Sequence, residues 1–254
     1  EKLEKGTAYM RLLFIRHGDP DYEHDCLTDK GIREAQLLAQ RMKKETMDHI
    51  YVSPMGRAQQ TASFTLHATG KPAATMEWLQ EFTPRIHRPD LPDQLSIPWD
   101  WRATDWMEKE SFYDQNAWKA DPILLEGNAP EVYDQVIHSF DALLESHGYA
   151  YNGKWYEVRC ESHDTLVFFC HFGIQCVILS HLLHLPVMAL LHGCIAAPTA
   201  VTELYSQEPL QGIATFRMTR YGDISHLEAG NEKPSDSGRF VECFSDDGRH
   251  QEAR

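Results

Sequence analysis

Two arginines and two histidines of this 254-residue chain follow short apolar runs, a setting that suits chemistry on an anionic group. Arg16 and His17 directly follow one run, and His171 directly follows a second. Arg57 follows a third run after a short polar stretch. Guanidinium groups bind phosphate oxygens in pairs, and a neutral imidazole can attack phosphorus and form a phosphohistidine. The four residues therefore predict a site that binds and transfers a phosphoryl group.

The three apolar runs are short and β-prone, which predicts buried strands. They are Leu12–Ile15, Ile50–Val52 and Leu166–Cys170. In an open α/β sheet, ligands bind beyond the carboxyl ends of the strands, so this arrangement would bring the four residues together. Gly18 comes next after His17, where it allows a sharp turn and the close approach of a ligand to the backbone.

The remaining pattern alternates between helical and extended segments. Apolar spacing predicts helices over residues 29–45, 54–67, 105–120, about 130–147 and 173–183. Strands are predicted over residues 48–52, 73–76, 165–170, 200–205 and 213–218, with a hairpin over 149–158. Strands that alternate with helices indicate a three-layer α/β/α sandwich with a mostly parallel sheet.

The start of the second helix bears directly on the predicted site. Ser53 is a good N-cap, and Pro54 is well suited to the first helical position. Arg57 then falls in the first turn, where unpaired backbone amides and the helix dipole favour an anion.

The stretch over residues 85–160 interrupts this pattern between the third strand and His171. Prolines break its first part repeatedly, and four of the six tryptophans lie there. We expect a lid over the site or a separate small core, and the sequence favours neither. The predicted organisation is a single domain over residues 10–229, with peripheral tails at 1–9 and 230–254.

Composition limits the partners that we expect. The net charge is 24 minus 38, or −14, which disfavours nucleic acid and anionic membranes. No apolar run is long enough to span a bilayer. The six cysteines show no CxxC pair, and we expect Cys170, Cys176 and Cys194 to be buried free thiols, which suggests a cytoplasmic location.

Longer motifs around these residues resemble the histidine phosphatase superfamily, in its phosphoglycerate mutase-like branch. The first is Arg16-His17-Gly18, and the second is Ser53-Pro54-x-x-Arg57-Ala58-x-Gln60-Thr61-Ala62. Thr28 to Ala35, reading Thr-x-x-Gly-x-x-x-Ala, is similar to the helix that follows the first motif in many members. The resemblance implies the phosphoglycerate mutase-like fold. It does not extend over residues 85–160.

The resemblance also implies roles for individual residues. His17 would be the nucleophile, and Arg16, Arg57 and His171 would complete the phosphate pocket. The family's proton donor is a glutamate after the third strand, which implies Glu81, with Glu77 as the competitor. Gly18 and Phe172 would line the substrate site. Phe172 departs from the family, which often has a small residue after the second histidine, and its ring could narrow the pocket.

These features predict a metal-independent phosphomonoester hydrolase that acts through a phosphohistidine on a small phosphorylated metabolite. We expect no cofactor and no metal site; His181, His184 and Cys176 do not make one, because their helix must bury its apolar residues. A phosphoglycerate-type mutase and a catalytically idle phosphate-binding protein are the alternatives. A homodimer is left open.

Overall fold

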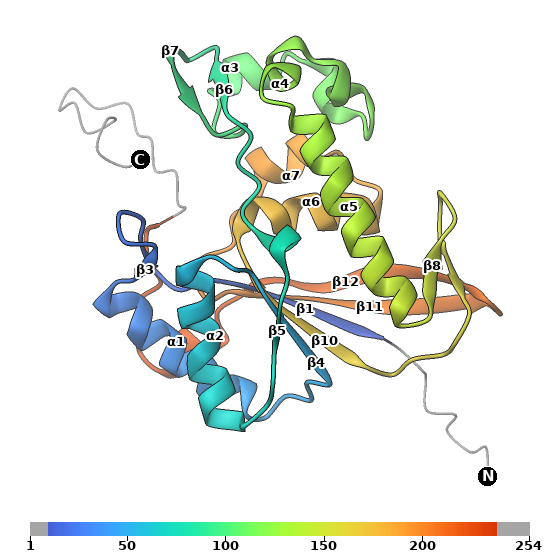
Figure 1. Ribbon diagram of the computed structural model, residues 1–254. Coiled ribbons are helices and arrows are strands. Elements are labelled where there is room, and N and C mark those ends of the chain that lie inside the picture. The colour runs from blue at the N-terminus through green and yellow to red at the C-terminus, as the bar shows by residue number, and fades with distance from the viewer. Residues whose placement is uncertain (1–9, 238–254) are drawn as a thin grey trace.

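The computed structural model describes residues 10–237, which form one eight-stranded sheet between two layers of helices (Figure 1). The strand order is β5-β4-β10-β1-β11-β12-β9-β8. The strands are β1 (Arg11–Arg16), β4 (His49–Val52), β5 (Ala74–Thr75), β8 (Tyr149–Tyr151), β9 (Tyr156–Val158), β10 (Thr165–Cys170), β11 (Val201–Leu210) and β12 (Ile213–Asp223). The predicted three-layer α/β fold is confirmed.

The sheet has a parallel half and an antiparallel half. Strands β5, β4, β10 and β1 pair in parallel, so their carboxyl ends share one edge. Strand β11 pairs antiparallel with β1, and the remaining strands continue antiparallel to β8. The parallel half contains the three apolar runs and thereby brings the ends of those runs together.

Two helical layers cover opposite faces of the sheet (Figure 1). One contains α1 (Asp29–Met42) and α2 (Gly56–Thr69), and the other contains α5 (Ala129–Ser146), α6 (Phe172–Leu183) and α7 (Val187–Gly193). Alternate residues of β1 serve the two cores, since Leu12 and Phe14 pack with the second layer and Leu13 and Ile15 with the first. The strand is buried on both faces because helices cover both.

Helix α1 begins as predicted, because the Thr28 side chain accepts a hydrogen bond from the Gly31 amide. Helix α2 begins later than predicted. Its N-cap is Met55, which makes no side-chain capping bond, and its first helical residue is Gly56. The prediction of Ser53 as N-cap and Pro54 as first helical residue was wrong, because the Ser53 hydroxyl bonds a histidine ring instead.

Short elements make up most of the tryptophan-rich insertion. They are β6 (Ile86–Arg88), β7 (Leu91–Ser96), α3 (Ala103–Trp106), the 3-10 helices η2 (Glu110–Tyr113) and η3 (Ala117–Ala120), and α4 (Pro122–Glu126). The predicted helix over 105–120 was therefore wrong. Trp99, Trp101 and Trp118 are buried in the same core cluster as the sheet, so these rings form core rather than a detached lid. Helix α7 was not predicted.

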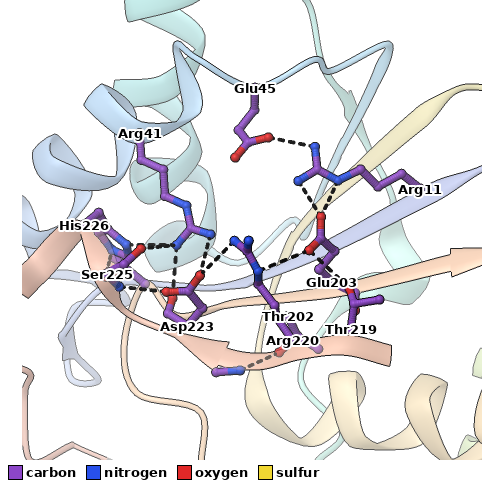
Figure 2. Close-up of polar contacts among 12 residues, drawn as sticks. Arg11, Arg41, Glu45, Thr202, Glu203, Thr219, Arg220, Asp223, Ser225 and His226 are labelled. Carbon is purple, nitrogen blue, oxygen red and sulfur yellow. Dashed lines mark hydrogen bonds and ion pairs between the residues drawn. The ribbon is translucent and has the colours of Figure 1, made fainter. Parts of the chain in front are cut away.

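Ion pairs join the antiparallel half of the sheet to β1 and to α1 (Figure 2). Arg11 on β1 bonds Glu203 on β11, and Arg41 on α1 bonds Asp223 at the end of β12. The short helix α8 (Ser225–Ala229) follows directly. These contacts fix where the chain enters its last described segment.

The described part of the C-terminal tail lies against α1. Ser235 is buried, its amide donates to Glu34, and Glu232 pairs with Lys30. The expected tails were 1–9 and 230–254; residues 1–9 and 238–254, with Cys243, lie outside the described residues. Cys170 and Cys176 are buried free thiols as predicted, whereas Cys194 is only partly buried. Within residues 10–237, no helix combines the length and apolarity that crossing a membrane requires.

Candidate active site

His17 directly follows β1, and its backbone amide extends the sheet by donating to the Cys170 carbonyl at 3.0 Å. Its ring Nδ1 lies 2.8 Å from the Gly18 carbonyl oxygen. A carbonyl oxygen can only accept, so Nδ1 carries the proton and Nε2 keeps its lone pair. Burial, reinforced by Arg16 and Arg57, holds the pKa of His17 well below its usual value. The ring is therefore a neutral imidazole with Nε2 free to act as a nucleophile.

His171 directly follows β10 and is the N-cap of α6. Its ring centroid lies 5.1 Å from that of His17, and its Nε2 is 2.7 Å from the Ser53 hydroxyl. Its Nδ1 is buried and has no hydrogen-bond partner within residues 10–237. Burial, and then the charge of neighbouring groups, lowers the pKa of His171 well below its usual value. An unpaired buried nitrogen of this kind is expected where a ligand binds.

Arg16 and Arg57 flank the two rings and are themselves buried. Arg16 donates from Nη1 to the Ala196 carbonyl at 2.6 Å, and its guanidinium carbon lies 5.9 Å from the centre of the Phe172 ring. The Nε groups of both arginines are buried without a partner in the described chain. Two buried guanidinium groups whose Nε donors have no partner, beside two imidazoles, form a site for an anion. Phe172 packs against Arg16 at this site, and its substrate-binding role stays a prediction.

Asp25, which the sequence analysis missed, holds Arg57 in place. Its carboxylate accepts from Arg57 Nη1 and from the Gly56 amide, both at 2.6 Å. These donors lower the pKa of Asp25 against the opposing effect of burial, so the carboxylate is charged. Asp25 lies in the turn between the paired strands β2 (Pro20–Asp21) and β3 (Cys26–Leu27) at a φ of 47°, a conformation that no residue pattern in this turn indicated.

Gly18 is explained by packing in this structure. Its amide donates to the Thr61 hydroxyl at 2.9 Å, and a Cβ at this position would lie 2.8 Å from the Gly31 carbonyl oxygen. The loop after β1 can therefore approach α1 and α2 only with glycine here. The predicted contact of Gly18 with substrate stays a prediction.

The structure places Glu81, and not Glu77, beside these residues. Glu81 Oε1 accepts from the amides of Phe82 at 2.8 Å and Ile174 at 3.0 Å, so it lies at the start of α6. Burial raises the pKa of Glu81 despite these donors and the two arginines. Glu77 lies exposed in the 3-10 helix η1 (Glu77–Leu79). Glu81 thus has the environment of a group that holds a proton near an anion.

Trp99 brings the insertion to the same place. A Cβ on Gly173 would lie 2.7 Å from the Trp99 ring and 2.8 Å from Glu81 Oε1, so the three residues are in close contact. The buried Arg88 donates to the Trp99 carbonyl at 2.8 Å and pairs with Asp90. The tryptophan-rich stretch therefore contributes both to the core and to the wall of the site.

Comparison with known families agrees with this fold and site. The family model of the histidine phosphatase superfamily (branch 1) matches residues 12–218, and the chain belongs to this superfamily.

Among curated proteins, a probable phosphoglycerate mutase GpmB of Yersinia pestis is 44% identical over 81 residues. The match spans 28% of this chain and 38% of that relative. A mycobacterial glucosyl-3-phosphoglycerate phosphatase has a similar structure, with a TM-score of 0.55 and 18% identity over 84% of this chain and 99% of that one. A phosphoserine phosphatase of Entamoeba histolytica, in complex with 3-phosphoglyceric acid, also has a similar structure. Its TM-score is 0.55, with 18% sequence identity over 86% of this chain and 99% of that one. At these identities, the structural likeness shows the fold.

Proposed function

We propose that the protein is a phosphomonoester hydrolase that forms a phosphohistidine on His17. The observation that carries the proposal is the tautomer of His17, because its bond to the Gly18 carbonyl leaves a neutral Nε2 among buried cationic donors. Such a nitrogen can attack phosphorus, and the donors around it can neutralise the charge on the equatorial oxygens.

In the first step, Nε2 of His17 forms a bond to phosphorus while the bond from phosphorus to the ester oxygen breaks. Glu81, whose acid form is favoured by burial, gives its proton to the departing alcohol oxygen. Arg16, Arg57 and His171 bind the phosphoryl oxygens during the transfer.

In the second step, a water molecule attacks the phosphohistidine. The Glu81 carboxylate now accepts the proton of that water, the bond from phosphorus to Nε2 breaks, and inorganic phosphate leaves. Both steps use side chains of this chain alone, so we propose that catalysis proceeds without a metal ion or a cofactor.

The proposed substrate is a small phosphomonoester. Two structural relatives are named for phosphoserine and glucosyl-3-phosphoglycerate, which are carboxylate-bearing esters. Near the site, His87 pairs with Glu126 and Arg88 with Asp90, so neither forms a free basic cluster for a second anionic group. Arg85 is exposed. A panel of esters with and without a carboxylate would identify the substrate class.

A phosphoglycerate-type mutase is the second candidate, and the match to the probable mutase supports it. In mutases of this family, an arginine and a tyrosine after the acid grip the substrate carboxylate. Phe82-Thr83-Pro84 follows Glu81 here, which favours the hydrolase.

The test is release of inorganic phosphate from the ester panel, with a chelator present, by the wild type and by His17→Ala. We expect release by the wild type and none by His17→Ala, while the exposed His67→Ala serves as the matched control and keeps full activity. Release that survives His17→Ala would disprove the nucleophile. Absence of release, with transfer of phosphate between hydroxyls of phosphoglycerate, would establish the mutase.

A further inference from the structure

A second cluster of potential ligands lies at the edge of the sheet opposite the candidate active site. His49 begins β4, Asp164 immediately precedes β10, and His147 caps the end of α5. In the parallel register, His49 stands beside Leu166, near the amino-terminal ends of both strands. The candidate active site lies at their carboxyl ends. The two sites therefore share strands but no residues.

The three side chains converge on one point. His49 Nε2 lies 3.5 Å from Asp164 Oδ2, and His147 Nδ1 lies 3.6 Å from the same oxygen. One ligand atom of each residue lies within 4.8 Å of the others. In a tetrahedral zinc site, ligand atoms about 2.0–2.1 Å from the metal are roughly 3.3 Å from one another. The two histidine-to-aspartate distances are close to this value.

A neighbouring hydroxyl orients the buried member of the cluster. His147 Nε2 lies 2.7 Å from the Tyr51 hydroxyl, and Tyr51 lies on β4 with His49. When Nε2 donates its proton to Tyr51, Nδ1 presents its lone pair toward Asp164 and His49. Metal-binding histidines commonly have their second nitrogen held in this way, which fixes the tautomer and the ring.

The backbone and the surface exposure also fit a binding site. Asp164 is held by its carbonyl, which accepts from the Arg11 amide at 2.9 Å, and by its amide, which donates to Ser162. The side chains of His49 and Asp164 are 46% and 40% exposed, which leaves a path for an ion. Asp48, the next acidic neighbour, is occupied by the Thr165 amide and is not needed as a ligand.

We propose that His49, His147 and Asp164 bind a divalent transition-metal ion of the zinc class, with water as the fourth ligand. Two imidazoles and one carboxylate form a donor set that binds Zn²⁺ in preference to Mg²⁺ and Ca²⁺, which favour oxygen ligands. The ion links the amino-terminal ends of β4 and β10 to the end of α5. It stabilises the fold and takes no part in the phosphoryl chemistry.

The test uses the full chain, stripped with a chelator and titrated with ZnCl₂ by calorimetry and with Co²⁺ by visible absorption. We expect one ion per chain, a tetrahedral Co²⁺ spectrum and a higher unfolding temperature when zinc is present. His49→Gln and Asp164→Asn should each weaken binding by at least about tenfold, and Tyr51→Phe by a similar factor through the lost orientation of His147.

Two controls separate this site from other histidines. His87→Gln removes an exposed histidine that pairs with one carboxylate, Glu126, and should keep the affinity of the wild type. His17→Ala should also keep it. Failure of the wild type to bind zinc, or unchanged affinity in either His49→Gln or Asp164→Asn, would overturn the proposal, as would loss of binding in His17→Ala. Phosphate release in the presence of chelator is independent of all these outcomes.

Discussion

At the scale of single residues, one contact to each of two rings decides what the rings can do. The Gly18 carbonyl leaves His17 with a lone pair on Nε2. When the Ser53 hydroxyl donates to Nε2 of His171, the proton of that ring lies on Nδ1, the nitrogen without a partner in the described chain. In the proposed mechanism, His17 would then be the nucleophile and His171 a neutral donor to a phosphoryl oxygen.

Ser53→Ala tests this assignment of a positioning residue. Without the hydroxyl, the proton of His171 is shared between both nitrogens and the ring loses its anchor. We expect kcat to fall roughly five- to tenfold, equivalent to about 1 kcal/mol for one hydrogen bond, with a smaller change in KM. Ser53→Thr keeps the hydroxyl and should recover part of the rate. Ser63→Ala, an exposed serine of α2, should have no effect. A rate unchanged in Ser53→Ala would contradict the assignment.

Glu81→Gln tests the proton donor. The quotient kcat/KM covers the steps up to alcohol release, and a proton is needed there only when the alcohol is a poor leaving group. We expect a loss of at least about 100-fold for an alkyl phosphate and a much smaller loss for p-nitrophenyl phosphate. An equal loss for both esters would assign Glu81 to positioning.

The pH profile of kcat/KM follows from the same group. Burial raises the pKa of Glu81, so its acid form persists above the ordinary carboxyl value of 4.5 and disappears as the pH rises through the raised pKa. We therefore expect a basic limb in wild type that is absent in Glu81→Gln. Burial lowers the pKa of His17, so the nucleophile stays neutral below its usual value of 6.5.

At the scale of elements, the strands at the centre of the sheet were predictable from their apolar runs. A strand such as Leu166–Cys170, apolar on both faces, is buried on both faces only when helices cover both sides of the sheet. The placement of Arg16, His17 and His171 followed from those strand ends. Asp25 and Trp99 could not be found in this way, since their contacts depend on loops whose path no periodicity records. In place of the helix expected at 105–120, short elements let Trp106 stack on His192 and Trp118 pack against Tyr133, which are separate partners.

Gly173→Ala tests the junction where α6, Glu81 and Trp99 meet. A methyl group there would lie 2.7 Å from the Trp99 ring and 2.8 Å from Glu81 Oε1, closer than real Cβ contacts. The ring and the carboxylate must move, so we expect at least about a tenfold loss in kcat/KM and a loss of stability of about 1–3 kcal/mol. Activity and urea unfolding would measure the two effects.

Gly193 offers the matched control, because a Cβ on this residue of α7 meets no atom within 4 Å. Gly193→Ala should therefore leave activity unchanged. If Gly173→Ala were as active as Gly193→Ala, the close contact of Glu81 with α6 would not matter for catalysis.

At the scale of the whole molecule, the parallel half of the sheet carries a proposed site at each end. The sequence does not indicate the metal cluster, because His49, His147 and Asp164 come from segments that only the folded topology brings together. The antiparallel half carries neither site. The Arg41–Asp223 ion pair joins it to α1, and the Arg11–Glu203 ion pair joins it to β1 (Figure 2).

Protonation of His226 makes the stability of the folded chain depend on pH. Its ring lies beside Arg41 and bonds the Thr199 hydroxyl at 3.0 Å, while the Thr199 amide donates to the carbonyls of Arg16 and His17 (Figure 2 shows His226 and Arg41). Burial, and then the charge of Arg41, lowers the pKa of His226 from 6.5 to about 4. Between these values the unfolded chain binds the proton and the folded chain does not, so stability is lost as the pH falls below 6.5.

We expect acidification from about pH 7.5 to about pH 5 to cost the wild type about 2 kcal/mol through His226, and His226→Gln to escape this loss. Glutamine can still donate to Thr199 but cannot gain a charge. Glu34 acts in the opposite direction, since burial raises its pKa to about 7, but it is present in both proteins and cancels in the difference. Urea unfolding at both pH values measures the effect, with the exposed His138→Gln as control. Equal acid sensitivity of wild type and His226→Gln would show that the ring is already solvated in the folded protein.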